Sequence, residues 1–290
     1  MQNKTKIVSL NDVGDLTYPY DFLDGGIENI KKITENNHEV SSLIKNAKKP
    51  LIIFGQSILK NKSAKYVFES IKSFLKNNNK ISNEWNSLNT ISDNASTVGS
   101  FDLGLYKTED GSNEVLKDLQ DNKFEIVYLL GADNLKFEKK NEFIIYQGSH
   151  GDKGAEMADI ILPGAAYTEQ NGYFTNLEGK LQKAYKASYP PEDAKEDWII
   201  INELAEAMNH RKLFNDKDEL DSSLLNQVNL FLEKDILTKS VEIKNLSFDK
   251  EILKITNDDY YYSNVIARAS KTMFECKNSK INLKSTGTEG

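Results

Sequence analysis

The sequence predicts an α/β fold, a largely parallel sheet flanked by helices. Four short apolar runs that end at turn residues support this class, at residues 50–55, 124–131, 143–148 and 159–164. Segments with helical spacing of apolar residues separate strands of this kind, which implies right-handed crossovers between parallel strands. Because parallel strands end on one side of a sheet, the turns that follow these runs are predicted to line a single crevice.

The remaining elements follow from local patterns. A short alternating run at residues 6–10 indicates an edge strand, and residues 50–55 indicate a strand buried on both faces. Ser63 is a suitable N-cap for a helix over residues 63–75. Residues 80–112 are expected to be loop with short elements. The other expected helices are residues 27–33, 38–47, 112–119, 197–208 and 222–232.

Residues 158–182 are the most informative stretch. Pro163-Gly164 ends an apolar run, and the residues that follow are rich in side chains with fixed hydrogen-bonding demands, such as Glu169 and Asn176. Two interpretations stay open from the residues alone. One is an ordinary long surface loop. The other is a loop packed on the carboxyl ends of a parallel sheet, where α/β proteins place their ligands.

Composition excludes several kinds of site. The net charge of −7 argues against a nucleic-acid binder, and no apolar run approaches the roughly 18–20 residues that span a bilayer. The single cysteine, Cys276, cannot supply the four thiolates of an iron–sulfur cluster, nor form a disulfide within the chain. The histidines His38, His150 and His210 lack the spacing of a zinc site.

The basic residues are almost all lysine. Only Arg211 and Arg268 are arginines, and the chain has thirty asparagines. This bias has no folding explanation, but an AT-rich genome, such as that of an organelle or a reduced bacterium, would encode it. Residues 1–20 show no basic amphipathic pattern, so no transit or signal peptide is expected. A mitochondrially encoded chain would need none.

The pattern Ala158-Asp159-x-x-Leu162-Pro163, followed by residues 169–182, resembles the molybdopterin oxidoreductase superfamily, which includes formate dehydrogenase. The closer resemblance is to the family of the largest iron–sulfur subunit, the 75 kDa type, of respiratory complex I. Residues 145–152 and 196–198 flank the central pattern as they do in that family. Residues 266–276 resemble its C-terminal segment.

The resemblance implies two parts. Residues 1–210 would form a degenerate molybdopterin oxidoreductase-like α/β domain, partial and completed by another chain. Residues 211–290 would form a mostly helical C-terminal extension typical of the complex I subunit, with a disordered tail from about residue 278. The metal-ligating residue and the C-terminal pterin-binding barrel of the catalytic relatives have no counterpart in this sequence.

The implied role is a scaffold in the peripheral, NADH-oxidising arm of complex I, without a catalytic centre, metal or cofactor in this chain. FMN and iron–sulfur clusters would lie in partner chains. The expected partners are the N-terminal iron–sulfur fragment of the same subunit and other peripheral-arm subunits. The chain would be at the matrix side of the mitochondrial inner membrane, or the cytoplasmic side of a bacterial plasma membrane, attached only through the complex. The alternative is a molybdopterin-binding oxidoreductase fragment of the formate dehydrogenase type.

The candidate site residues are therefore structural. Glu169 and Glu178 could pair for acid–base chemistry, but hydrogen bonds that hold the loop are the favoured interpretation. For His150 and Asp152, a capped turn is favoured over a catalytic dyad. Cys276 is expected to be a small buried hydrophobe. The predicted loop-organising residues are His150, Asp159, Glu169, Asn176, Glu178, Gln182 and Trp198; those of the C-terminal motif are Arg268, Ser270 and Cys276.

Overall fold

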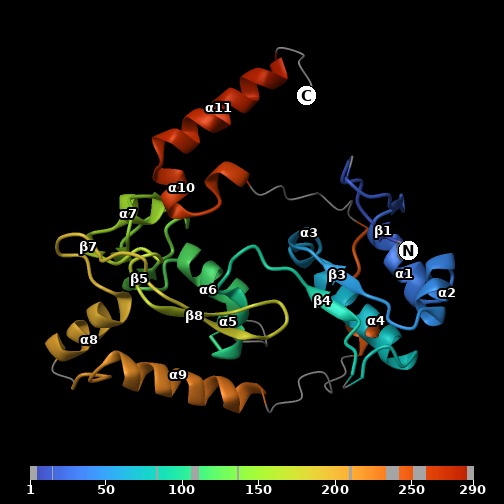
Figure 1. Ribbon diagram of the computed structural model, residues 1–290, viewed down its shortest axis with the longest axis horizontal. Coiled ribbons are helices and arrows are strands. Elements are labelled where there is room, and N and C mark those ends of the chain that lie inside the picture. The colour runs from blue at the N-terminus through green and yellow to red at the C-terminus, as the bar shows by residue number, and fades with distance from the viewer. Residues whose placement is uncertain are drawn as a thin grey trace. The chain divides into compact units, whose positions relative to one another are not determined.

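The computed structural model describes residues 5–14, 16–82, 84–105, 111–135, 137–208, 211–232, 242–250 and 259–285. The chain divides into two compact units (Figure 1). The first comprises residues 1–97 and 234–257, and the second comprises residues 98–233 and 258–290. Of the expected C-terminal extension, residues 211–233 and 258–290 belong to the second unit and residues 234–257 to the first.

The first unit is built from short strands and four helices among its described residues. Its strands pair in parallel, β1 with β2 and β3 with β4. The elements are β1 (Val8–Ser9), β2 (Asp21–Phe22), α1 (Ile27–Thr34), α2 (Glu39–Asn46), β3 (Ile52–Phe54), α3 (Gln56–Leu59), α4 (Ala64–Asn77), β4 (Leu88–Thr90) and the 3-10 turn η2 (Ile243–Asn245).

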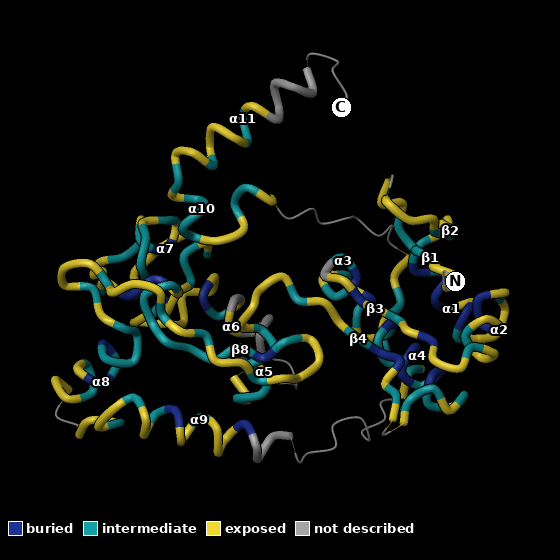
Figure 2. The backbone as a smooth tube through the Cα atoms, viewed as in Figure 1, coloured by how far each residue is buried: buried dark blue, intermediate teal, exposed yellow. Residues whose placement is uncertain are grey.

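The apolar stripe of α4 forms the centre of this unit. Val67, Ile71 and Leu75 are almost fully buried and pack with Ile27 and Phe54 of α1 and β3. The helical spacing of these residues therefore reports core packing, as expected. Figure 2 shows the buried positions of the unit gathered on α1, β3 and α4.

The second unit contains the remaining elements. They are α5 (Thr97–Asp102), α6 (Gly111–Gln120), β5 (Ile126–Leu130), β6 (Phe143–Gly148), α7 (Lys153–Met157), β7 (Ile160–Pro163), β8 (Gly172–Thr175), β9 (Leu181–Ala184), α8 (Asp197–Ala207), α9 (Lys217–Leu232), η3 (Tyr260–Tyr262), α10 (Val265–Ala269) and α11 (Lys271–Ser285). Helices combined with mainly parallel strands confirm the predicted α/β class.

Strands β5, β6 and β7 form a parallel sheet in that order. On one face Leu129, Ile144 and Tyr146 are buried together. On the opposite face the register aligns Ile126 with Phe143, and both side chains are exposed. The apolar runs therefore predicted the strands correctly. The described elements cover this opposite face only in part, around Gln147, which has no exposed surface.

Two expectations about the strands are wrong. β3 does not join the other three in one sheet, since it pairs with β4, which lies in a region expected to be mostly loop. It is also not buried on both faces, because Ile53 is 52% exposed. The run at residues 50–55 specifies an extended segment, but it carries no information about the strand's partner.

Residues 172–184 form an antiparallel hairpin that is not among the elements expected from the sequence. β8 pairs with β9, with Thr175 opposite Leu181. The turn is closed by Asn176, whose Oδ1 accepts hydrogen bonds from the N–H groups of Glu178 and Lys180 at 3.0 and 2.9 Å. Gly179 adopts a φ of 78° in this turn, a conformation that glycine tolerates best.

The last described helix of the C-terminal extension is α11, which runs to Ser285. The expected disordered tail from about residue 278 stays a prediction. No proline or glycine lies between Lys271 and Ser285, so neither helix breaker interrupts α11. Residues 286–290 lie outside the described residues. Among the helices that the structure describes, none has the length and apolarity to cross a membrane.

Candidate functional site

The strands β5, β6 and β7 end at one edge of their sheet, and the turns after them meet there. Gly131, at φ 59°, donates its N–H to Gln147 O at 2.9 Å, and Gly164 donates to Gly148 O at 3.0 Å. A cleft of about 450 Å³ lies at this edge. Its lining residues are Gly148, Ser149, His150, Pro163, Gly164, Glu169, Pro191, Glu192, Asp193 and Ala194.

Gln147, at the carboxyl end of β6, is the centre of a hydrogen-bonded group that we call the Asp197 network. Its Nε2 donates to Asp197 Oδ1 at 2.8 Å, and its Oε1 accepts a hydrogen bond from the Tyr128 hydroxyl. Gln170 Nε2 donates to the second carboxylate oxygen of Asp197 at 2.9 Å. The network joins β5, β6, the loop between β7 and β8, and the first residue of α8. Gln147 is not among the site residues predicted from the sequence, although a glutamine within an apolar strand is a usable signal.

The close approach of Asp197 to the sheet edge requires glycine at position 164. A Cβ atom there would lie 2.8 Å from Asp197 Oδ1. At Gly148 a Cβ atom would overlap the Tyr146 hydroxyl oxygen. Both glycines therefore leave room for neighbouring polar groups, and the cleft edge is closely packed.

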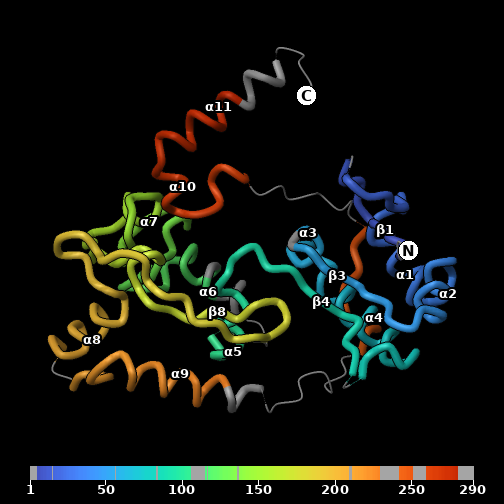
Figure 3. The backbone as a smooth tube through the Cα atoms, viewed as in Figure 1, coloured from blue at the N-terminus to red at the C-terminus, as the bar shows by residue number. Residues whose placement is uncertain are grey.

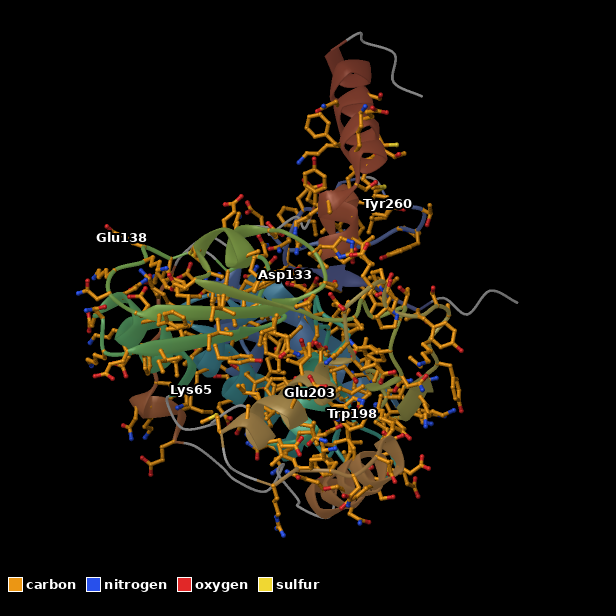
Figure 4. The ribbon with its side chains drawn as sticks, turned by 90° about the vertical axis from the view of Figure 1, so that its left-hand side faces the viewer. Lys65, Asp133, Glu138, Trp198, Glu203 and Tyr260 are labelled. Atoms are coloured by element: carbon orange, nitrogen blue, oxygen red, sulfur yellow. The ribbon has the colours of Figure 1, made fainter. Side chains whose placement is uncertain are left out.

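A second polar contact at this edge, the Arg268 junction, comes from the C-terminal extension. Arg268 of α10 donates from Nη2 to Asp133 Oδ2 at 2.5 Å and from Nε to Asp152 Oδ2 at 2.6 Å. The three side chains are 16–21% exposed. Asp133 follows β5, and Asp152 caps α7 by accepting from the Lys153 N–H at 2.8 Å. Figure 4 shows Asp133 close to the C-terminal helices.

The charges at the junction shift the pKa of Asp152. Burial acts to raise this pKa, but the hydrogen bond from Arg268, the bond from the Lys153 N–H and the positive charge of Arg268 outweigh it, so the pKa is lowered. The carboxylate is therefore the stable form in the folded chain. An arginine suits this position because its planar group can contact two carboxylates at once.

The buried phenols are not suited to acid–base chemistry near neutral pH. Burial, followed by the nearby charges of Asp133 and Asp152, raises the pKa of Tyr146 to about 12. Its hydroxyl donates to His150 O at 3.1 Å. Burial and then the charge of Asp197 also raise the pKa of Tyr128. Both side chains act as neutral hydrogen-bond donors.

Glu169 and His150 both line the cleft, as two of the predicted loop-organising residues. Glu169 Oε2 accepts from the N–H of Ala166 at 3.0 Å, which fixes the chain just after β7. His150 Nδ1 lies 3.0 Å from Ser149 Oγ. Asp152 is occupied by the Arg268 junction, so the structure places His150 and Asp152 in separate contacts rather than in a dyad.

Glu169 and Glu178 are not brought together. Glu178 lies in the turn between β8 and β9 and is exposed, and only its backbone N–H takes part in the turn. Its prediction as a loop-organising side chain is wrong, because Asn176 alone closes the turn. Gln182 is likewise exposed on β9, and only its position opposite Phe174 in the hairpin ladder has a structural role.

Two further predicted residues act away from the cleft. Asp159 lies at the opposite, amino-terminal edge of the sheet, where Oδ2 accepts from Ile144 N–H at 2.8 Å and Oδ1 pairs with Lys139 at 2.6 Å. The backbone bond and then Lys139 lower its pKa. Trp198 Nε1 donates to Glu196 Oε2 at 3.1 Å, a contact confined to the start of α8.

The C-terminal motif residues have three different roles. Arg268 forms the junction described above. Ser270 Oγ accepts from the Met273 N–H at 3.3 Å and so begins α11. Cys276 is exposed on α11, so its prediction as a buried hydrophobe is wrong. Among the described residues, no element covers the face of α11 that carries it. Within the ranges described above, no group of three metal-ligating side chains is placed for a metal ion.

Comparison with known proteins identifies the family. Residues 1–207 match the family model of molybdopterin oxidoreductase. The chain belongs to the molybdopterin oxidoreductase family. Residues 229–276 match a second model, the C-terminal part of the G-type subunit of NADH-ubiquinone oxidoreductase.

Curated relatives carry the names of complex I subunits. The chain is 32% identical to the NADH-ubiquinone oxidoreductase 75 kDa subunit of Reclinomonas americana, over 95% of this chain and 41% of that protein. It is 35% identical to the G-type subunit of NADH-quinone oxidoreductase from Rickettsia bellii, over 97% and 41%, respectively. The mitochondrial 78 kDa subunit of Candida albicans is 37% identical over 79% of this chain and 33% of its own length. The chain thus spans about two fifths or less of these relatives.

The cleft does not fit the cofactor after which the family is named. Molybdopterin carries a phosphate group, whose binding requires positive charge or free N–H donors. The residues that line the cleft include the acidic residues Glu169, Glu192 and Asp193, and neither lysine nor arginine. The polar groups of the Asp197 network are already bonded to one another.

Proposed function

We propose that this chain is a non-catalytic, structural part of the peripheral, NADH-oxidising arm of respiratory complex I. Its relatives are named as subunits of that enzyme over nearly the whole of this sequence. The observation that carries the non-catalytic role is the sheet edge, where Gln147, Asp197 and Arg268 bond to partners within the chain. A single cysteine supports the absence of a cluster, since a cluster takes four thiolates.

The proposal assigns the redox groups to partner chains. FMN and the iron–sulfur clusters would be bound by other peripheral-arm subunits, among them a separate polypeptide that carries the cluster-binding part of the same subunit. Exposed apolar side chains on one face of the β5–β7 sheet, such as Ile126 and Phe143, support such a partner, because parallel sheets are normally covered on both faces. The site of action would be the matrix side of the mitochondrial inner membrane, or the cytoplasmic side of a bacterial plasma membrane.

Affinity purification of the tagged chain from detergent-solubilised membranes tests this proposal. The expected result is a large assembly with FMN, iron–sulfur signals and NADH–quinone activity, in which a second polypeptide supplies the rest of the relatives' length. A single longer polypeptide containing these residues would contradict the split subunit. Stoichiometric molybdenum, tungsten or pterin on the isolated chain would favour the alternative, a molybdopterin-binding fragment of the formate dehydrogenase type.

A further inference from the structure

The last described elements of the second unit, η3, α10 and α11, are joined to one another at their base. Arg268 of α10, besides its two carboxylate partners, donates from Nη1 to Tyr262 O of η3 at 3.3 Å. Lys277 of α11 pairs with Asp259, and its Nζ lies 4.3 Å from the centre of the Tyr262 ring. The base is therefore fixed to the sheet edge through the Arg268 junction. We call residues 259–279 the η3–α11 surface.

Beyond this base, α11 has little cover. It packs on η3 and α10, the elements just before it, and in the backbone trace of Figure 3 it continues away from them. Of the nine residues from 271 to 279, six are exposed and none is buried. A helix of 15 residues is marginal in water by itself, and Asn278 and Ser279 are weak helix formers. A covering surface would therefore stabilise α11.

Two aromatic side chains are exposed on the η3–α11 surface. Tyr260 is 81% exposed and Phe274 is 53% exposed. The Tyr260 ring packs edge-on against Tyr261, with 5.5 Å between the ring centres, and Figure 4 shows Tyr260 beside the C-terminal helices. Aromatic side chains are enriched at the positions that contribute most to binding in protein interfaces. Their exposure here indicates a docking surface for another polypeptide.

The charge of α11 indicates the chemistry of the occupant. In a chain with a net charge of −7, the sequence of α11 has a net charge of +3, from one glutamate, Glu275, and four lysines, Lys271, Lys277, Lys280 and Lys284. The side chain of Lys271 is 91% exposed. Because interfaces bring opposite charges together, a surface of this charge is complemented by carboxylates of the occupant.

The positions of the apolar residues favour a protein groove over a membrane surface. At about 100° per residue, Phe274 and Cys276 occupy nearly opposite sides of α11, and Ile281 and Leu283 repeat these two positions two turns later. A helix that lies on a membrane has one broad apolar face. A helix with apolar residues on two sides suits a groove that contacts both of them.

We propose that the η3–α11 surface docks in an acidic, apolar-walled groove of another polypeptide of the peripheral arm. Phe274 and Tyr260 would contact the walls of the groove, and the lysines of α11 would pair with its carboxylates. The inference rests on the proposed function and deepens it. The segment that matches the second family model ends at residue 276, inside α11, so the docking gives the end of that segment a role.

Zero-length cross-linking of the complex purified through the tagged chain tests the docking. A carbodiimide couples a lysine amine only to a carboxylate that is in direct contact with it. We expect peptides that contain Lys271 to be joined to acidic residues of a second polypeptide. Coupling of the α11 lysines only to carboxylates of their own chain, such as Asp259, would overturn the proposal.

Cys276 provides a second readout, because it is the single cysteine of the chain and is exposed. Its modification by a maleimide is followed by mass spectrometry of this chain's own peptide. The rate should be at least about tenfold lower in the native complex than in the same complex after denaturation. Equal rates would show that α11 is uncovered in the assembly, which would overturn this inference and leave the proposed function intact.

Variants measure what each side chain contributes to the docking. Phe274→Ala should lower the ratio of assembled to free chain by about fivefold or more, and Lys271→Glu by about two- to fivefold. The matched controls are Leu105→Ala, at another exposed apolar residue of the same unit, and Lys65→Glu, at an exposed lysine of α4. Neither control should change the ratio. An unchanged ratio in both α11 variants would overturn the proposal.

Binding to a membrane is the competing outcome. The full chain is mixed with vesicles of phosphatidylcholine and phosphatidylserine and floated on a density gradient, and we expect it to stay with the soluble fraction. Co-flotation that Lys271→Glu abolishes would assign the surface to an anionic membrane and overturn the proposal. A tagged chain that purifies without an NADH-oxidising assembly would overturn the proposed function, and this inference with it.

Discussion

Gln147 and Asp197, 50 residues apart in the chain, are joined by a hydrogen bond of 2.8 Å between Nε2 and Oδ1. Gln147 has no exposed surface, so the bond is made where water cannot replace it. The chain's own side chains thus occupy the end of β6, beside the cleft at the edge where α/β proteins commonly bind ligands. This relationship is the basis for the first prediction.

Gln147→Leu should lower the free energy of unfolding by about 1–3 kcal/mol, because Asp197 and Tyr128 each lose a buried partner. Gln182→Leu, on the exposed face of β9, should change it by no more than about 0.5 kcal/mol. Denaturant unfolding of both variants measures the difference. Equal stabilities would show that the Asp197 network is not a structural contact.

Gly164→Ala should destabilise the chain by about 1–3 kcal/mol, because the new Cβ atom would overlap Asp197 Oδ1. Gly151→Ala is the matched control, since a Cβ atom there meets nothing within 4 Å. Thermal unfolding should separate the two variants. A neutral Gly164→Ala would mean that α8 can move away from the sheet edge without cost.

Glu169→Ala should reduce the amount of assembled complex while leaving NADH oxidation per assembled complex unchanged. The expected cost is about 1–3 kcal/mol, because the buried N–H of Ala166 loses its acceptor. Glu178→Ala should assemble normally, since the Glu178 side chain is exposed. A Glu169 variant that assembles at the normal level but has lost turnover would point to a catalytic role.

Arg268→Gln should destabilise the chain by about 1.5–3 kcal/mol at neutral pH through the loss of charged hydrogen bonds. The pKa of Asp152 is lowered in the folded chain, so the stability it contributes is present above its unfolded pKa of about 3.9 and is lost as pH falls through the folded value. The difference between the wild-type chain and the variant should therefore shrink below about pH 4. Free energies of unfolding measured from pH 7 to pH 3 test this. If the wild-type chain and the variant differ by the same amount at every pH, the loss of stability does not come from the Arg268 junction.

The chain expressed without partners should self-associate through the exposed apolar side chains on one face of the β5–β7 sheet, because exposed apolar patches are interaction surfaces. The double variant Ile126→Lys with Ile160→Lys should reduce this association in sedimentation experiments. Leu177→Lys, at an equally exposed leucine in the hairpin turn, should not. In the assembly we expect this face to contribute to an interface above roughly 2,000 Å². A soluble monomer with a sharp thermal transition would contradict the need for a partner.

The sequence by itself determined the α/β class, because apolar runs ending at glycine and helical stripes such as that of α4 are local signals. It also determined the family, since residues 158–182 and 266–276 carry its patterns. Asn176 and Glu169, which were predicted as loop-organising side chains, each accept hydrogen bonds from backbone N–H groups nearby in the chain. Short-range hydrogen bonds of this kind depend on neighbouring residues and can therefore be inferred from the order of residues alone.

Only the tertiary structure decided which strands share a sheet and which polar groups meet. The run at residues 50–55 pairs with β4, and nothing in its own pattern distinguishes that partner from β5. The bond between Gln147 and Asp197 and the junction of Arg268 with Asp133 join residues far apart in the chain. Glu178 and Cys276 were assigned wrongly for the same reason. Burial is set by which elements come to cover a residue, and local sequence does not specify that cover.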